Sequence, residues 1–131
     1  MSTLSETPIE GPRINEAYAM RPYRYLYAWH PTRDDNLPNS VAKVDTTTGK
    51  AKVWIDNAAA EANTYMGEPV FLPAPGASAE DDGVVLSVGV DVTKRAAFLV
   101  VLNATTMTEL ARAWAGAHVT FGFHTLFVPS A

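Results

Sequence analysis

Short apolar stretches alternate with turn-forming residues along most of this chain. In residues 23–29 aromatic side chains recur at every second position, which predicts a strand with Tyr23, Tyr25, Tyr27 and Trp29 on one face. This pattern favours packing within a sheet over an aromatic binding platform. Residues 1–22 are polar and rich in proline and glycine, so we expect an irregular approach to the first strand.

The rest of the chain continues the same pattern of short strands and polar connectors. Residues 41–55 predict a hairpin whose turn is the run 46–50, and residues 58–62 could form one helical turn. Residues 108–114 have some helical propensity, but their neighbours favour a strand. Further strands are expected at 68–72, 83–91, 96–103 and, with a break at Gly122, at 118–128. The prediction is an all-β protein, with sandwich, barrel and propeller left open.

Composition narrows the classes of function. The chain has 131 residues, which is enough for one domain. Its composition, with 47% hydrophobic and 18% charged residues, is typical of a globular protein. A net charge of -4 and the absence of a Lys/Arg cluster argue against nucleic acid as a partner. Without cysteine, any metal must be held by His, Asp or Glu. No leader-like or membrane-spanning stretch occurs in the sequence, so a cytoplasmic location is expected.

The residues that could hold a metal or take part in catalysis are three histidines and a few acids. His118 and His124 lie six residues apart, about 20 Å along a straight strand, so they could share a metal only across a bend. The first interpretation of each histidine is a structural or solvent-exposed residue, and this applies to His30, His118 and His124. The run 80–83, Glu-Asp-Asp-Gly, is first of all a turn signal. The short motifs of serine hydrolases, phosphate loops and zinc helices are absent, so the residues alone do not identify an enzyme.

Several strings nevertheless follow one another in the order found in a known family. They are Glu10-Gly11-Pro12-Arg13-Ile14-Asn15, the aromatic strand 21–27, Gly67-Glu68-Pro69-Val70-Phe71-Leu72-Pro73, the run 80–87 and Phe121-Gly122-Phe123-His124. Together they resemble the C-terminal portion of the carotenoid oxygenases, the family that includes carotenoid cleavage dioxygenases and the retinal pigment epithelial membrane protein. The resemblance covers nearly the whole chain.

The resemblance implies a seven-bladed β-propeller with Fe(II) on its axis, held by four histidines. His124 matches the last of these ligands, and Glu10 and Glu68 match two glutamates that orient ligand imidazoles. A carboxylate that accepts one imidazole N–H fixes the tautomer and raises the basicity of the other nitrogen. Residues 1–131 would then be a C-terminal fragment that supplies the last blades, with 1–22 as the irregular approach and strands within 23–128.

The implied activity is oxidative cleavage of a C=C bond of a carotenoid, an apocarotenoid or a related stilbene by O2, which gives carbonyl products. The other ligand histidines are expected outside these residues, so we expect the isolated chain to be inactive and to need the remaining blades as partners. Peripheral membrane contact is expected of the full-length protein. The alternative is a non-catalytic remnant or interaction module that retains the β fold. Thr125 departs from the pattern, because the family usually has glycine after the ligand histidine.

Overall fold

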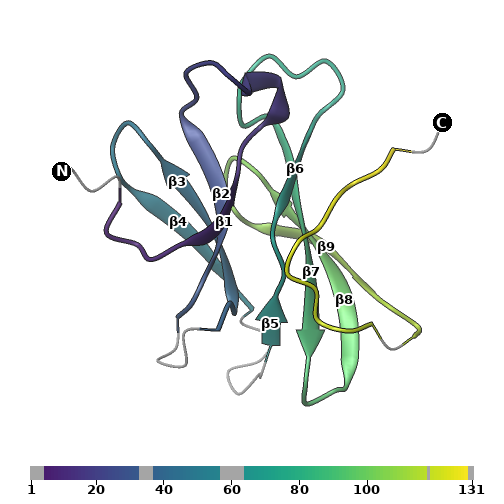
Figure 1. The fold of residues 1–131 in the computed structure, drawn as a ribbon. Helices are drawn as coiled ribbons and strands as arrows, with labels where there is room; N and C mark the ends of the chain where they lie inside the picture. Colours follow the sequence, from purple (N-terminus) through teal and green to yellow (C-terminus); the bar gives the residue numbers. More distant parts are fainter. Residues whose placement is uncertain (1–4, 33–36, 57–63, 118, 130–131) are drawn as a thin grey trace.

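Two antiparallel β-sheets lie side by side in the computed structural model, which describes residues 5–32, 37–56, 64–117 and 119–129 (Figure 1). The first sheet has the strand order β1-β2-β3-β4, formed by Glu10–Arg13, Tyr25–His30, Ser40–Asp45 and Ala51–Ile55. The second has the order β5-β7-β8-β9, with β6 also paired to β7; these strands are Thr64–Met66, Val70–Pro73, Gly83–Asp91, Ala96–Asn103 and Glu109–Trp114. The all-β prediction is confirmed.

The predicted hairpin is present in the first sheet. Strands β3 and β4 pair with Val41 opposite Trp54. The Asp45 carboxylate accepts hydrogen bonds from the backbone N–H groups of Thr47 and Thr48, and Gly49 has a φ of 70°, a left-handed conformation that glycine adopts without strain. The turn residues read from the sequence therefore close this hairpin.

The second sheet confirms the strands predicted around residues 83–103 and 108–114. Strand β7 pairs with β8 along nearly its whole length, with Val85 opposite Leu102. Strand β8 in turn pairs with β9, with Leu99 opposite Ala113. Residues 109–114 form a strand and not a helix, as the neighbouring segments predicted.

The main core lies between the two sheets. The ring of Tyr27 in β2 stacks on that of Phe71 in β6, with centroids 5.4 Å apart and an interplanar angle of 12°. Leu26 and Ala28, on the opposite face of β2, pack with Val44 in a second cluster. The alternation of aromatic residues in β2 thus serves sheet packing, as predicted, and both faces of the strand are buried. The main cluster comprises Tyr27, Val41, Trp54, Met66, Phe71, Val85, Phe98, Val100, Leu102, Ala104 and Met107.

Two segments differ from the sequence-based expectation. Residues 1–22 are not wholly irregular, because strand β1 pairs with β2 and a 3₁₀ helix, η1, follows at Glu16–Tyr18. Proline is tolerated on an edge strand, and Pro12 lies on such a strand. The prolines of residues 1–22 therefore did not exclude a strand there. Residues 119–129 form no strand, contrary to the prediction for 118–128. The predicted helical turn at 58–62 lies outside the described residues.

The remaining differences are smaller. The strand expected at 68–72 begins at Val70, and β5 was not predicted as a separate strand. None of the helices in the described part of the chain is long and apolar enough to cross a membrane.

Tyr27 makes the stability of the fold sensitive to high pH. Its side chain is fully buried, and its hydroxyl donates to the carbonyl of Ala104. Burial, with the nearby Asp81 and Glu80 carboxylates, raises the pKa of the phenol well above its usual value of 10.0. Above pH 10 the unfolded chain loses a proton that the folded chain keeps, so the free energy of unfolding falls as pH rises.

We therefore expect the Tyr27→Phe variant to lose less stability at alkaline pH than the parent chain. The slope above pH 10 should be shallower by about 1.4 kcal/mol per pH unit, measured by urea unfolding at a series of pH values. The exposed Tyr23→Phe variant controls for the loss of one tyrosine. Equal alkaline slopes for Tyr27→Phe and the parent would contradict the prediction.

Candidate metal-ligand site

Glu68 occupies a buried position between β5 and β6. Its side chain is 7% exposed, which is unusual for a carboxylate and calls for partners. The preceding residue is glycine for a steric reason, since a Cβ at position 67 would lie 2.9 Å from the carbonyl oxygen of Gly122. Gly67 therefore allows residues 119–129, here called the C-terminal segment, to approach the backbone at Glu68.

The C-terminal segment is attached to Glu68 on both sides of His124. The backbone N–H of Glu68 donates to the carbonyl of Phe123 at 3.2 Å, and the hydroxyl of Thr125 donates to the carbonyl of Glu68 at 2.6 Å. The ring of Phe123 also meets that of Trp29 in β2 edge-on, with centroids 6.1 Å apart. Although it forms no strand, the segment has a defined place across the face of the molecule (Figure 1).

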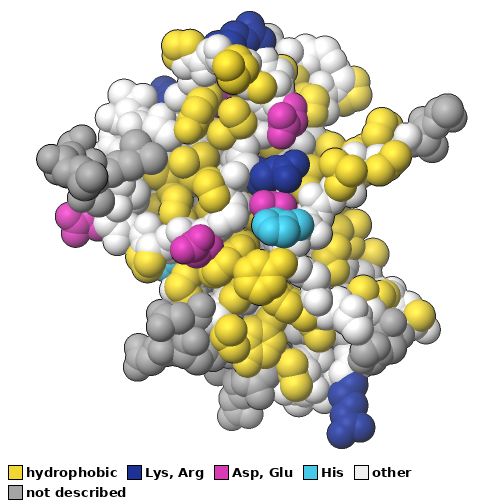
Figure 2. All heavy atoms as spheres, in the orientation of Figure 1, with side chains coloured by type: hydrophobic (Ala, Val, Ile, Leu, Met, Phe, Trp, Pro, Cys, Tyr) yellow, Lys and Arg dark blue, Asp and Glu magenta, His cyan; other side chains and the backbone are white. Residues whose placement is uncertain are grey.

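The imidazole of His124 faces the Glu68 carboxylate. Its Nδ1 lies 3.5 Å from Oε1, and its side chain is 83% exposed. This distance exceeds that of an ordinary N–H···O hydrogen bond, but bonds of this kind often tighten only when the ligand is bound. Figure 2 shows a histidine, an acidic and a basic side chain together in the middle of a largely hydrophobic surface.

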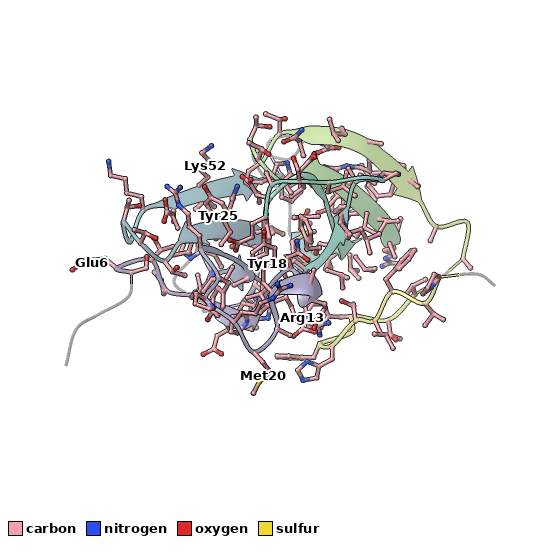
Figure 3. The ribbon with its side chains drawn as sticks, turned by 90° about the horizontal axis from the view of Figure 1, so that it is seen from above. Glu6, Arg13, Tyr18, Met20, Tyr25 and Lys52 are labelled. Carbon is pink, nitrogen blue, oxygen red and sulfur yellow. The ribbon has the colours of Figure 1, made fainter. Side chains whose placement is uncertain are left out.

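The basic side chain at this site is Arg13, from the last position of β1. Its Nη1 donates to Oε2 of Glu68 at 3.3 Å. Figure 3 shows Arg13 beside the C-terminal segment. Gly11 allows this approach, because it has a φ of 58° and a Cβ there would lie 2.9 Å from Nε1 of Trp29 and 3.6 Å from Cγ of Glu68. The motif that contains Glu10 therefore reaches the site through Arg13.

The structure brings together only part of the predicted set of residues. Glu68 and His124 are adjacent, whereas Glu10 is exposed and lies opposite Trp29 in the backbone pairing. Among the described residues, Glu10 makes no hydrogen bond or ion pair with either of them. His30 has its Nδ1 at the carbonyl of Pro8 and not at Glu68, and His118 lies outside the described residues. His124 itself lies in the C-terminal segment and not on a strand.

Arg13 and Thr125 were not assigned a role from the sequence. Arg13 stands in the same string as Glu10, and a buried acid needs a cation or N–H donors, so the presence of a partner could have been inferred. Which residue would supply it depends on pairings between residues more than fifty positions apart.

The run 80–83 has the structural role that its turn signal predicted. The Glu80 carboxylate accepts hydrogen bonds from the backbone N–H groups of Arg24 and Tyr25, at 2.7 to 2.9 Å. The next residue, Asp81, forms an ion pair with the buried Lys43 of β3. These two acids hold the β6–β7 connection against the first sheet, and among the described residues neither forms a hydrogen bond or ion pair with His124.

The arrangement fits one ligand of a metal ion. A neutral imidazole that faces a carboxylate through Nδ1 leaves Nε2 free to coordinate, and the exposure of His124 leaves room for an ion. Within the described ranges no group of three or more His, Asp and Glu side chains could hold a metal. A complete site would need further ligands.

Comparison with known proteins finds relatives that are named as carotenoid oxygenases and dioxygenases. The sequence model of the family described as retinal pigment epithelial membrane protein matches residues 1–129. A carotenoid isomerooxygenase of Galleria mellonella is 45% identical over 115 residues, which cover 84% of this chain and 21% of that protein. A beta,beta-carotene 15,15'-dioxygenase of Mus musculus is 40% identical over 128 residues, which cover 94% of this chain and 21% of that protein. The chain thus spans about a fifth of the length of these relatives.

Solved structures agree with the sequence comparison. A mutant of the Synechocystis apocarotenoid oxygenase superposes with a TM-score of 0.82 at 26% identity, over 92% of this chain and 25% of that chain. A cobalt-substituted form of the same oxygenase matches with the same values. These structural relatives are β-propellers, which confirms the predicted fold class. Which blades the two sheets form stays a prediction.

Proposed function

Because this chain belongs to the retinal pigment epithelial membrane protein family, which includes the carotenoid oxygenases, we propose that it is the C-terminal part of a non-heme Fe(II) dioxygenase. The reaction is cleavage of a C=C bond of a carotenoid, an apocarotenoid or a related stilbene by O2, with two carbonyl products. The observation that carries the proposal is the pairing of His124 with the buried Glu68, both at positions that the family resemblance marks.

In this proposal His124 supplies one of the iron ligands through Nε2. The metal, when bound, supplies the activation of O2. The residues of this chain contribute orientation: Glu68 faces Nδ1 of His124, and the backbone bonds to Phe123 and Thr125 hold the ring in place. The other ligand histidines and most of the substrate tunnel come from residues outside this chain, and peripheral membrane contact is a property of the full-length protein.

A graft tests the role of His124. Residues 1–131 would replace the matching quarter of the Synechocystis apocarotenoid oxygenase, and iron content and apocarotenoid cleavage would be measured. The graft should bind iron stoichiometrically and cleave substrate, whereas its His124→Ala variant should lose bound iron and activity. The His30→Ala graft is the matched control, because the Nδ1 of His30 meets the carbonyl of Pro8 and not Glu68.

Two results would oppose the proposal. One is a His124→Ala graft that keeps the iron content and activity of the unmodified graft. The other is a folded, unmodified graft that binds no iron, which would favour the non-catalytic alternative. For the 131-residue chain alone we expect no stoichiometric iron, since no ligand group of three is present among its described residues.

A further inference from the structure

The two oxygens of the Glu68 carboxylate have different partners. Oε2 accepts from Nη1 of Arg13 at 3.3 Å and from the backbone N–H of Thr125 at 3.4 Å. Oε1 faces Nδ1 of His124 at 3.5 Å. With Oε2 occupied by two donors from different parts of the chain, the carboxylate plane is fixed and Oε1 is directed at the imidazole.

Thr125 adds a contact that glycine at this position cannot make. Its hydroxyl donates to the carbonyl of Glu68 at 2.6 Å, in addition to its backbone N–H bond to Oε2. Positive φ values among the described non-glycine residues occur at Met20, Arg95 and Met107 and not at Thr125. The β-branched side chain is therefore accommodated without left-handed strain, and the departure from the family pattern brings a hydrogen bond to the residue that faces His124.

The orientation of the carboxylate matters because a neutral imidazole has two tautomers. If Nδ1 carries the proton, it donates to the carboxylate and Nε2 offers a lone pair to a metal; if Nε2 carries it, that nitrogen cannot coordinate. The side chain of His124 is 83% exposed, and its ring neighbour Phe123, with centroids 6.2 Å apart, is apolar and cannot select between the two. The selection must come from the Glu68 side.

We propose that Arg13 and Thr125 are positioning residues for His124. Arg13 holds Oε2 of Glu68 through Nη1, and Thr125 holds it through its backbone N–H, which the bond from the Thr125 hydroxyl to the Glu68 carbonyl keeps in place. Oε1 is thereby directed at Nδ1 and keeps the imidazole in the Nδ1–H tautomer, with Nε2 free. The use of Nε2 as an iron ligand rests on the proposed function, but the tautomer is a property of this chain and can be measured without metal.

The test is the tautomer of His124 in the 131-residue chain labelled with ¹⁵N at histidine. Long-range ¹H–¹⁵N spectra at about pH 8.5, roughly two units above the ordinary histidine pKa, would report which ring nitrogen carries the proton. The parent chain should show mainly the Nδ1–H form of His124. Thr125→Val, which removes the hydroxyl and keeps the shape, and Arg13→Gln should both shift His124 toward the Nε2–H form.

Conservative variants and an internal reference separate positioning from general damage. Thr125→Ser keeps a hydroxyl and Arg13→Lys keeps a cation, so both should retain most of the parent tautomer. His30, whose Nδ1 faces the carbonyl of Pro8, should stay unchanged in all four variants. The proposal is overturned if Thr125→Val and Arg13→Gln leave His124 unaltered, or if His124 shifts only together with His30.

The outcomes also distinguish this inference from the proposed function. A shift of the His124 tautomer in Thr125→Val, combined with full iron content in the His124→Ala graft, would keep the positioning role and remove the ligand role. Loss of iron in the His124→Ala graft without any tautomer shift in the chain variants would do the reverse.

Discussion

Asp81→Leu is expected to destabilise the folded chain by about 3–5 kcal/mol, because it leaves the ammonium of Lys43 buried without its partner. The Lys43 side chain is 5% exposed, against 15% for Asp81, and its Nζ lies 4.0 Å from the centroid of the Tyr25 ring. Burial lowers the pKa of Lys43 even though the Asp81 carboxylate acts in the opposite direction. Desolvation of the ammonium is therefore the larger effect, and the pair is sensitive to the loss of the acid.

A double-mutant cycle by urea unfolding measures this coupling. Lys43→Met removes the more buried charge and leaves Asp81 partly hydrated, so its cost should be smaller, about 1–3 kcal/mol. The double variant Lys43→Met with Asp81→Leu should return close to the stability of the parent, since an apolar pair can replace a buried ion pair. Additive costs in the double variant would show that the pair is not coupled.

Glu68→Ala is expected to lower the iron affinity of the graft by about 10–100-fold, the usual effect of removing a carboxylate that orients a ligand imidazole. The backbone bond from Glu68 to Phe123 does not depend on the side chain, so the C-terminal segment should stay attached. Affinity would be measured by competition with an iron chelator. Glu68→Gln, which keeps an acceptor oxygen at the same length, should lose less.

Glu10 provides the contrasting variant. It is exposed and makes no hydrogen bond or ion pair with His124 in the described part of the chain, so Glu10→Ala should leave the His124 tautomer unchanged in the 131-residue chain. If Glu10 orients a histidine from outside this chain, the same substitution should still reduce iron affinity in the graft. Unchanged affinity in both glutamate variants would remove both carboxylates from the metal site.

The strands were the most predictable part of the structure. The runs 83–91 and 96–103 coincide with β7 and β8, because β-branched residues bounded by turn residues give a clear local signal. Strand β1 was missed, since four residues that include Gly11 and Pro12 have no strand signal of their own and pair only because β2 is adjacent. The C-terminal segment was expected to be a strand from its apolar residues, but its contacts are with single residues such as Glu68 and Trp29 and not with a strand ladder.

The site was predictable only in part. His124 and Glu68 were assigned from the family resemblance, and the structure places them together. The spacing of residues could not have done so, because Arg13, Glu68 and Thr125 are separated by 55 and 57 positions. The composition indicated which residue types could bind a metal. Only the tertiary structure determines which of these residues lie next to one another.

These long separations also determine when the site can form. Strands β7 and β8 pair through a short connection and can assemble early, whereas the link from Arg13 through Glu68 to Thr125 joins three distant regions of the chain. Closing such contacts carries a large loop entropy, so the link forms late and opens first. In hydrogen-exchange terms, the backbone N–H of Thr125 should exchange long before those of β7 and β8, and iron loading should follow folding and not guide it.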